Sequence, residues 1–180
     1  NPHFLFNTLN NIYALIPISQ EKAQKSVHEL SQLLRYTLYD NENREVPLEK
    51  ELRFVKNYIS LMQLRMNSYT TLNTLINENE GKGKFIAPLL FITLIENAFK
   101  HGISGNKPSF IDIFITVQDN SVNCTVRNSY FPKTDSDKSG SGIGITNLKR
   151  QLNILYPKRH SFTITKINNQ YISELTIYLS

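Results

Sequence analysis

The first third of the chain repeats apolar side chains every three or four residues, which is the period of an amphipathic α-helix. After Val27 this spacing connects Leu30, Leu34 and Leu38. The polar stretch 40–43 ends this run. A longer run then alternates steps of four and three residues, as a heptad repeat does: Leu48, Leu52, Val55, Ile59, Met62 and Met66. The pattern therefore predicts an antiparallel pair of helices.

The second of these helices is expected to begin near Pro47, because proline fits the first turn of a helix. Glu49 and Glu51 follow at the end where the helix dipole favours negative charge. The apolar stripe has two interpretations at this stage. It either packs inside the chain or forms an interface between two copies of it.

Beyond residue 67 the pattern changes to an alternation of apolar and polar side chains, which is typical of strands. Turns are expected at 119–120 and 168–169, each joining two strands in a hairpin. The expected strands are 69–77, 110–117, 122–126, 161–166 and 171–179, and the expected helices are 88–102 and 145–156. This grouping predicts an α+β fold, with a helical hairpin at 1–67 and a two-layer α/β sandwich at 68–180.

Composition sets limits on this picture without changing the fold. Apolar residues make up 40% of the chain and charged residues 19%, which is typical of a folded domain. The net charge is +5, but Lys and Arg are spread along the chain, so nucleic-acid binding is disfavoured. Because Cys124 is the single cysteine, an internal disulfide and a Cys-x-x-Cys metal site are excluded.

Membrane and targeting signals are missing from the sequence pattern. The longest nearly apolar run, 85–95, is too short to cross a bilayer. Residues 1–11 lack the basic start and the long apolar stretch of a signal peptide. Because the chain begins with Asn1 rather than Met, we expect it to be a fragment of a longer protein.

Reactive side chains gather on one stripe of the helix expected over 88–102. Glu96, Asn97, Lys100 and His101 are neighbours at helical spacing, opposite an apolar face. Oxygen ligands of this kind suit Mg²⁺, which keeps several waters and also binds substrate phosphates. The alternative interpretation is an ordinary solvated helix face.

A glycine-rich segment leads into the helix expected over 145–156. Gly140, Gly142 and Gly144 allow the backbone to approach a phosphate, and the helix N-terminus that follows supplies N–H donors. A Rossmann motif is disfavoured because a polar loop precedes the glycines, and a P-loop because no Gly-Lys-Ser/Thr follows. The alternative interpretation is a flexible turn.

The chain opens with Asn-Pro-His-Phe-Leu-Phe-Asn-Thr-Leu-Asn, which places His3 near the start of a helical run. A lone histidine is more often structural. Together with the stripe and the glycine segment, however, this opening resembles the LytS-like branch of sensor histidine kinases, whose ATP-binding domain has the Bergerat (GHKL) fold. In this resemblance His3 is the phosphoacceptor, 88–102 contains the N box, and 140–150 is the glycine box. The motifs agree with the family in order and spacing.

The resemblance implies that ATP and Mg²⁺ are used to phosphorylate His3, and that the phosphoryl group then passes to an aspartate of a response regulator. It implies that Asn97 ligates Mg²⁺ and that Glu96 polarises the reaction at the γ-phosphate. A homodimer through the helical segment, and a cytoplasmic position after a membrane sensor, are also implied. The remaining nucleotide contacts would be Lys100, His101, Gly140, Gly142, Gly144 and Asn147.

The sequence departs from the family at two places. Where many members have an Asp-x-Gly motif that reads adenine, this chain has Asn128 followed by Ser129. The amide oxygen of Asn128 can still accept a hydrogen bond from the adenine amino group, although more weakly than a carboxylate. Phe4 follows His3 where some kinases have an acidic residue, so no base for the imidazole proton is assigned. A degenerate, non-catalytic module for ATP binding and dimerisation is the alternative.

Overall fold

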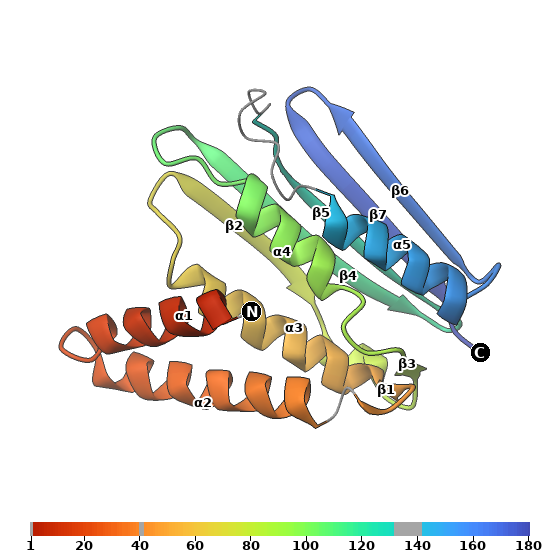
Figure 1. Cartoon of the computed structure of the whole chain (residues 1–180), viewed down its shortest axis with the longest axis horizontal. Helices are drawn as coiled ribbons and strands as arrows, with labels where there is room; N and C mark the ends of the chain where they lie inside the picture. Colours follow the sequence, from red (N-terminus) through yellow and green to blue (C-terminus); the bar gives the residue numbers. More distant parts are fainter. Residues whose placement is uncertain (1, 40–41, 132–141) are drawn as a thin grey trace.

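The computed structural model describes residues 2–39, 42–131 and 142–180, with side chains from Phe4 onward. Two α-helices come first, and the other three alternate with the strands (Figure 1). The helices are α1 (Pro2–Leu15), α2 (Gln20–Leu38), α3 (Leu48–Gln63), α4 (Ile92–His101), α5 (Ile143–Leu155) and a short 3₁₀ turn, η2 (Glu78–Gly81). The strands are β1 (Val46–Pro47), β2 (Thr70–Ile76), β3 (Phe85–Ile86), β4 (Ser109–Gln118), β5 (Ser121–Ser129), β6 (His160–Ile167) and β7 (Gln170–Tyr178).

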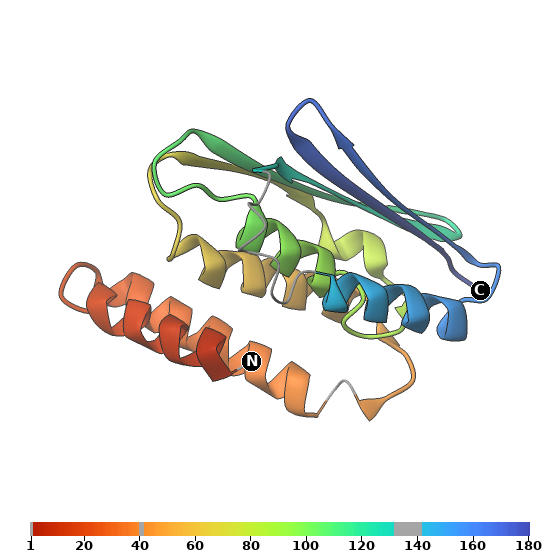
Figure 2. The same ribbon diagram turned by 45° about the horizontal axis from the view of Figure 1, so that its top comes forward.

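The main sheet has the strand order β2-β4-β5-β7-β6. The strands β2 and β4 are parallel and α4 connects them, whereas every other pair in this sheet is antiparallel. Figure 2 shows α3, α4 and α5 as one layer beneath the sheet, with α1 and α2 on the far side of α3. The predicted α+β fold, a helical hairpin followed by a two-layer sandwich, is confirmed.

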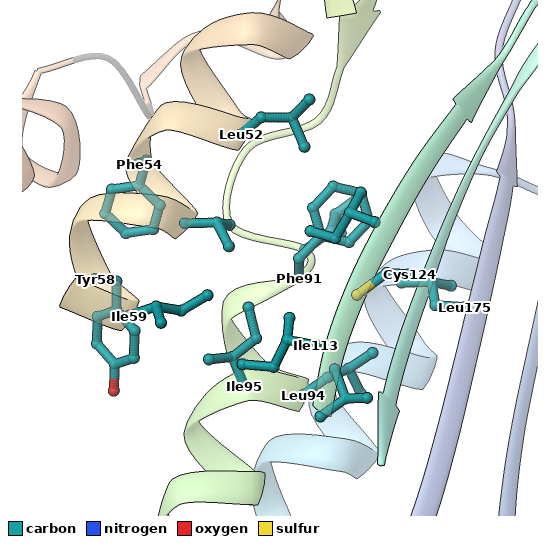
Figure 3. Close-up of a cluster of buried hydrophobic side chains, with 14 of the residues drawn as sticks. Leu52, Phe54, Tyr58, Ile59, Phe91, Leu94, Ile95, Ile113, Cys124 and Leu175 are labelled. Carbon is teal, nitrogen blue, oxygen red and sulfur yellow. The ribbon is translucent and has the colours of Figure 1, made fainter. Parts of the chain in front are cut away.

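The apolar stripe of α3 forms part of the core within one chain. Leu48, Leu52, Val55 and Ile59 are all at most 4% exposed. The helix packs against α2 and against α4, and Figure 3 shows side chains of α3, α4 and the sheet meeting in one cluster. Of the two interpretations of the stripe, the structure supports an intrachain core.

The expected boundary at residue 67 falls inside this packed unit. Val46 of β1 pairs with Ile86 of β3, across that boundary, and α3 also contacts η2. The division into 1–67 and 68–180 therefore stays a prediction. Among the described helices, none combines the length and apolar composition that a membrane-spanning segment requires.

Two local expectations need correction. The helix expected from Pro88 begins only at Ile92, because residues 88–91 form a turn in which Leu89 has a φ of 62°. Glu51, expected as an acidic residue whose charge suits the start of the helix, is instead fully buried in the core, and burial raises the pKa of its carboxyl group to about 7.

Candidate functional site

The reactive stripe lies on the side of α4 that faces away from the core. Leu94, Ile95, Ala98 and Phe99 form the buried side. On the other side, Glu96 and Lys100 are exposed, while Asn97 and His101 are partly buried. The helix is thus amphipathic as expected, and its polar side remains accessible to a ligand.

The end of α4 packs tightly against Asn128 of β5. Gly102 follows the last helical residue, and its N–H donates to the carbonyl oxygen of Ala98 at 2.7 Å. A Cβ at position 102 would lie 2.7 Å from the Cβ of Asn128 and 2.9 Å from its Nδ2. Glycine is therefore required for the helix to end this close to the strand.

Asn128 presents a buried acceptor at this place. The side chain is 1% exposed, and its Nδ2 donates to the Ser129 carbonyl oxygen at 2.8 Å. Its Oδ1 has no hydrogen-bond partner among the described residues. A buried polar atom without a partner is costly, and a ligand that donates a hydrogen bond would remove that cost. The amino group of adenine is such a donor.

The described part of the glycine segment forms the start of α5 beside α4, as Figure 1 shows for the two helices. Gly142 caps α5 with a φ of 111°, and its carbonyl oxygen accepts from the Thr146 N–H at 2.9 Å. A Cβ on Gly144 would touch the Thr93 side chain of α4 at 3.4 Å. Asn147 is exposed on α5. Gly140 lies outside the described residues.

The first turn of α1 also approaches this region. Phe4 stacks on Tyr58 of α3, with ring centroids 5.2 Å apart. Burial and then the negative charge of Glu96 raise the pKa of Tyr58, so Glu96 lies within electrostatic reach of that ring. Partial desolvation also raises the pKa of the Glu96 carboxyl. His3 belongs to this turn of α1, although its side chain lies outside the described part of the structure.

Comparison with known proteins decides the family. A family model described as "Histidine kinase" matches residues 1–77. The sensor protein LytS of Staphylococcus haemolyticus is 34% identical over 169 residues, which cover 87% of this chain and 29% of that protein. The sensor histidine kinase/phosphatase LytS of Staphylococcus aureus (strain MRSA252) is 32% identical over 171 residues, 88% of this chain. The chain belongs to the LytS-like histidine kinases.

The match to these LytS proteins covers less than a third of their length, since the chain spans 29% of each. A solved structure agrees with the fold. The histidine kinase domain of the blue-light activated histidine kinase EL346 from Erythrobacter litoralis aligns with a TM-score of 0.52 and 16% identity. The alignment covers 90% of this chain and 82% of that domain.

In this LytS-like chain, two aromatic residues that the sequence analysis missed lie beside the candidate site. Tyr171 of β7 lies opposite Asn128 of β5 in the sheet. Its side chain also shares a hydrogen bond with Asn97. Burial raises the pKa of the Tyr171 hydroxyl, and this hydrogen bond partly offsets the rise. The ring of Tyr130 lies 6.4 Å from that of Tyr171, and the Lys166 Nζ lies over both rings. The sequence signal that could have found Tyr171 is the hairpin turn at 168–169, because this turn determines the register of β7.

Replacing Gly102 with alanine in this LytS-like chain is expected to weaken ATP binding about tenfold or more. The new Cβ must displace Asn128 or the last turn of α4, and a lost hydrogen bond of a buried group costs on the order of 1–3 kcal/mol. Titration with a fluorescent ATP analogue measures the effect, with the melting temperature as a check on folding. Gly105→Ala is the matched control, because its Cβ would meet nothing within 4 Å. Equal affinities of the two folded variants would contradict the assignment of Asn128.

Proposed function

We propose that this chain is the catalytic core of a sensor histidine kinase in a two-component system. It binds ATP with Mg²⁺, transfers the γ-phosphoryl group to His3, and passes it on to an aspartate of a response regulator. The observation that carries the proposal is the stacking of Phe4, in the first turn of α1, on Tyr58 of α3, a ring that lies within electrostatic reach of Glu96. This arrangement supports an approach of the segment that contains His3 to the stripe that would hold the nucleotide phosphates.

The side chains around the end of α4 fit an adenine nucleotide. The buried Oδ1 of Asn128 is available to accept from the adenine amino group. The start of α5, with Gly142 and Gly144, offers N–H groups that have no acceptor within the helix, and the positive end of a helix dipole, to phosphate oxygens. Three further side chains are proposed as phosphate or nucleotide contacts: Lys100, His101 and Asn147.

Asn97 is the proposed ligand of Mg²⁺. The described residues contain no group of three or more His, Cys, Asp or Glu side chains that could hold a metal ion by themselves. An ion bound through one amide oxygen, waters and substrate phosphates fits this donor set. When bound, Mg²⁺ would neutralise charge on the phosphate oxygens. The side-chain oxygen of Asn97 would ligate the ion, and its amide N–H can keep the bond to Tyr171.

Phosphoryl transfer depends mainly on alignment and on charge neutralisation, because little covalent assistance is needed. In this proposal His3 attacks through a neutral imidazole nitrogen. Lys100 supplies positive charge near the transferred group, and the partly desolvated Glu96 polarises the reaction at the γ-phosphate.

The outer surface of α1 supports the proposed homodimer. Phe6, Leu9, Tyr13 and Ile16 are each at least 45% exposed. Their spacings of three, four and three residues place Phe6, Leu9 and Tyr13 along one side of α1, and Ile16, one residue past its end, continues that line. A continuous exposed apolar stripe is typical of an interaction surface. We further infer that the chain lies on the cytoplasmic side of a membrane sensor, where ATP and a response regulator are present.

The test is incubation of the chain with γ-labelled ATP and Mg²⁺. We expect the protein to acquire label that is stable in base and lost in acid, because a phosphoramidate hydrolyses under acidic conditions. ATP binding without label would instead favour the alternative, a degenerate module that binds nucleotide and dimerises. Failure to bind ATP at all would contradict the nucleotide site as well.

A further inference from the structure

Glu51 is a carboxylate buried at the centre of the packed helices, and the proposed function leaves it unused. The residue is 0% exposed. The Tyr36 hydroxyl of α2 donates to its Oε2, and the Leu89 N–H donates to the same oxygen at 3.2 Å. Thus one side chain of α3 bonds both α2 and the turn that precedes α4.

Burying this group is costly. Desolvation raises the pKa of the Glu51 carboxyl to about 7, although the hydrogen bond from Tyr36 and the amides of Leu89 and Leu90 lower it. Its Oε1 has no partner among the described residues. An apolar residue would fill this position of α3 at lower cost, as Leu48, Leu52 and Val55 do around it. The carboxylate therefore serves something other than packing.

The turn bonded by Glu51 determines where α4 begins. Leu89 has a φ of 62°, a left-handed conformation that is strained for a residue with a Cβ. The Ala87 N–H, just before the turn, donates to the buried Tyr156 hydroxyl at 2.8 Å. The Phe91 carbonyl oxygen, at the end of the turn, accepts from the N–H groups of Leu94 and Ile95. The turn is therefore held from both sides, and Glu96 and Asn97 follow within two turns of helix.

We propose that Glu51 is a positioning residue that couples α2 to the nucleotide-binding helix α4. Through Tyr36, it links the position of α2 to the turn at Leu89, and through that turn to Glu96 and Asn97. A shift of α2 relative to α3, of the kind a preceding sensor would produce, changes the alignment of the phosphates with His3. This inference rests on the proposed kinase function and assigns to it a route of control.

The substitution Tyr36→Phe separates coupling from packing. It keeps the ring, which stacks on Phe54 with centroids 4.6 Å apart, and removes only the hydroxyl bonded to Glu51. We expect the ATP dissociation constant to change less than about twofold. The rate of labelling should fall about tenfold, the scale of one lost hydrogen bond of a buried group. Tyr178→Phe, an exposed tyrosine on β7, is the matched control.

Amide hydrogen exchange measures how firmly the turn at Leu89 is held, independently of catalysis. In Tyr36→Phe the amides of the peptide covering 86–95 should exchange faster, whereas the amides of β5 should be unchanged. The inference is overturned if this peptide is unaffected, or if ATP affinity and labelling rate fall by the same factor. If the wild-type chain acquires no label, the proposed function fails, and the exchange data still test the coupling.

Glu51→Gln tests the role of the charge. Glutamine keeps one acceptor oxygen for Tyr36 and Leu89 but does not titrate. In the wild type the folded state keeps its proton up to about pH 7, whereas the unfolded state loses it above about pH 4.5. The free energy of unfolding should therefore fall as pH rises through this window, and the fall should be smaller in Glu51→Gln.

Tyr156 at the end of α5 and Cys124 of β5 also face the Glu51 charge, but both stay protonated in this range, because burial raises their pKa values. Equal slopes in the two proteins would overturn the assignment.

Discussion

His3→Gln is expected to abolish labelling by γ-labelled ATP, with label falling to background, while ATP binding changes less than about twofold. Glutamine keeps a polar side chain in the first turn of α1 but lacks the nucleophilic imidazole nitrogen. The nucleotide contacts proposed above come from α4, α5 and β5, so they remain complete. Acid-labile label is counted after electrophoresis, and ATP affinity is measured by titration.

A matched control for His3 exists on the neighbouring helix. His28 is exposed on α2, where its Nε2 hydrogen-bonds the Gln32 side chain at 2.8 Å. His28→Gln is expected to keep full labelling. Persistence of label in His3→Gln would remove His3 as the acceptor. Loss of both labelling and ATP binding would contradict the separation of the acceptor from the nucleotide site.

Asn97→Asp is expected to lower the labelling rate by about 100-fold or more, the scale for removing a group that stabilises transition-state charge. The substitution replaces a neutral oxygen ligand by a carboxylate and removes the amide hydrogens available to Tyr171. An extra negative charge beside the phosphates also opposes the approach of the nucleotide. Labelling at several Mg²⁺ concentrations, together with circular dichroism, shows the loss in a folded protein.

The same substitution can be made where it should have no effect. Asn153 is exposed on α5 and has no assigned role in the site. Asn153→Asp adds the same charge to a helix surface, so it controls for net charge and helix propensity. Full activity in Asn97→Asp, or equal losses in the two variants, would exclude Asn97 from the Mg²⁺ site.

Local physical chemistry made much of this fold predictable. Ile111, Ile113 and Ile115 alternate along β4 and are all buried, because side chains of a strand point to opposite faces. The turn at Asn168 and Asn169 has φ values of 51° and 57°, which asparagine tolerates better than most residues. These signals depend only on neighbours in the chain. The motifs at His3, Glu96–Asn97 and 140–144 likewise predicted a family that the comparisons then showed.

The tertiary structure decided what each buried face packs against. Pro88 favours a helix start, but the turn is held by Glu51, which is 38 positions away from Leu89 in the sequence. The strand pair β1–β3 and the side-chain pair Tyr171–Asn97 also join segments that are distant in the sequence. In addition, β1 and β3 have two residues each, which is too short to show an alternation of apolar and polar side chains. Periodicity along the sequence indicates that a face of a helix or strand is buried. It does not indicate which element covers that face, the energetic cost of burying Glu51, or the unsatisfied acceptor of Asn128. These depend on contacts between segments that only folding brings together.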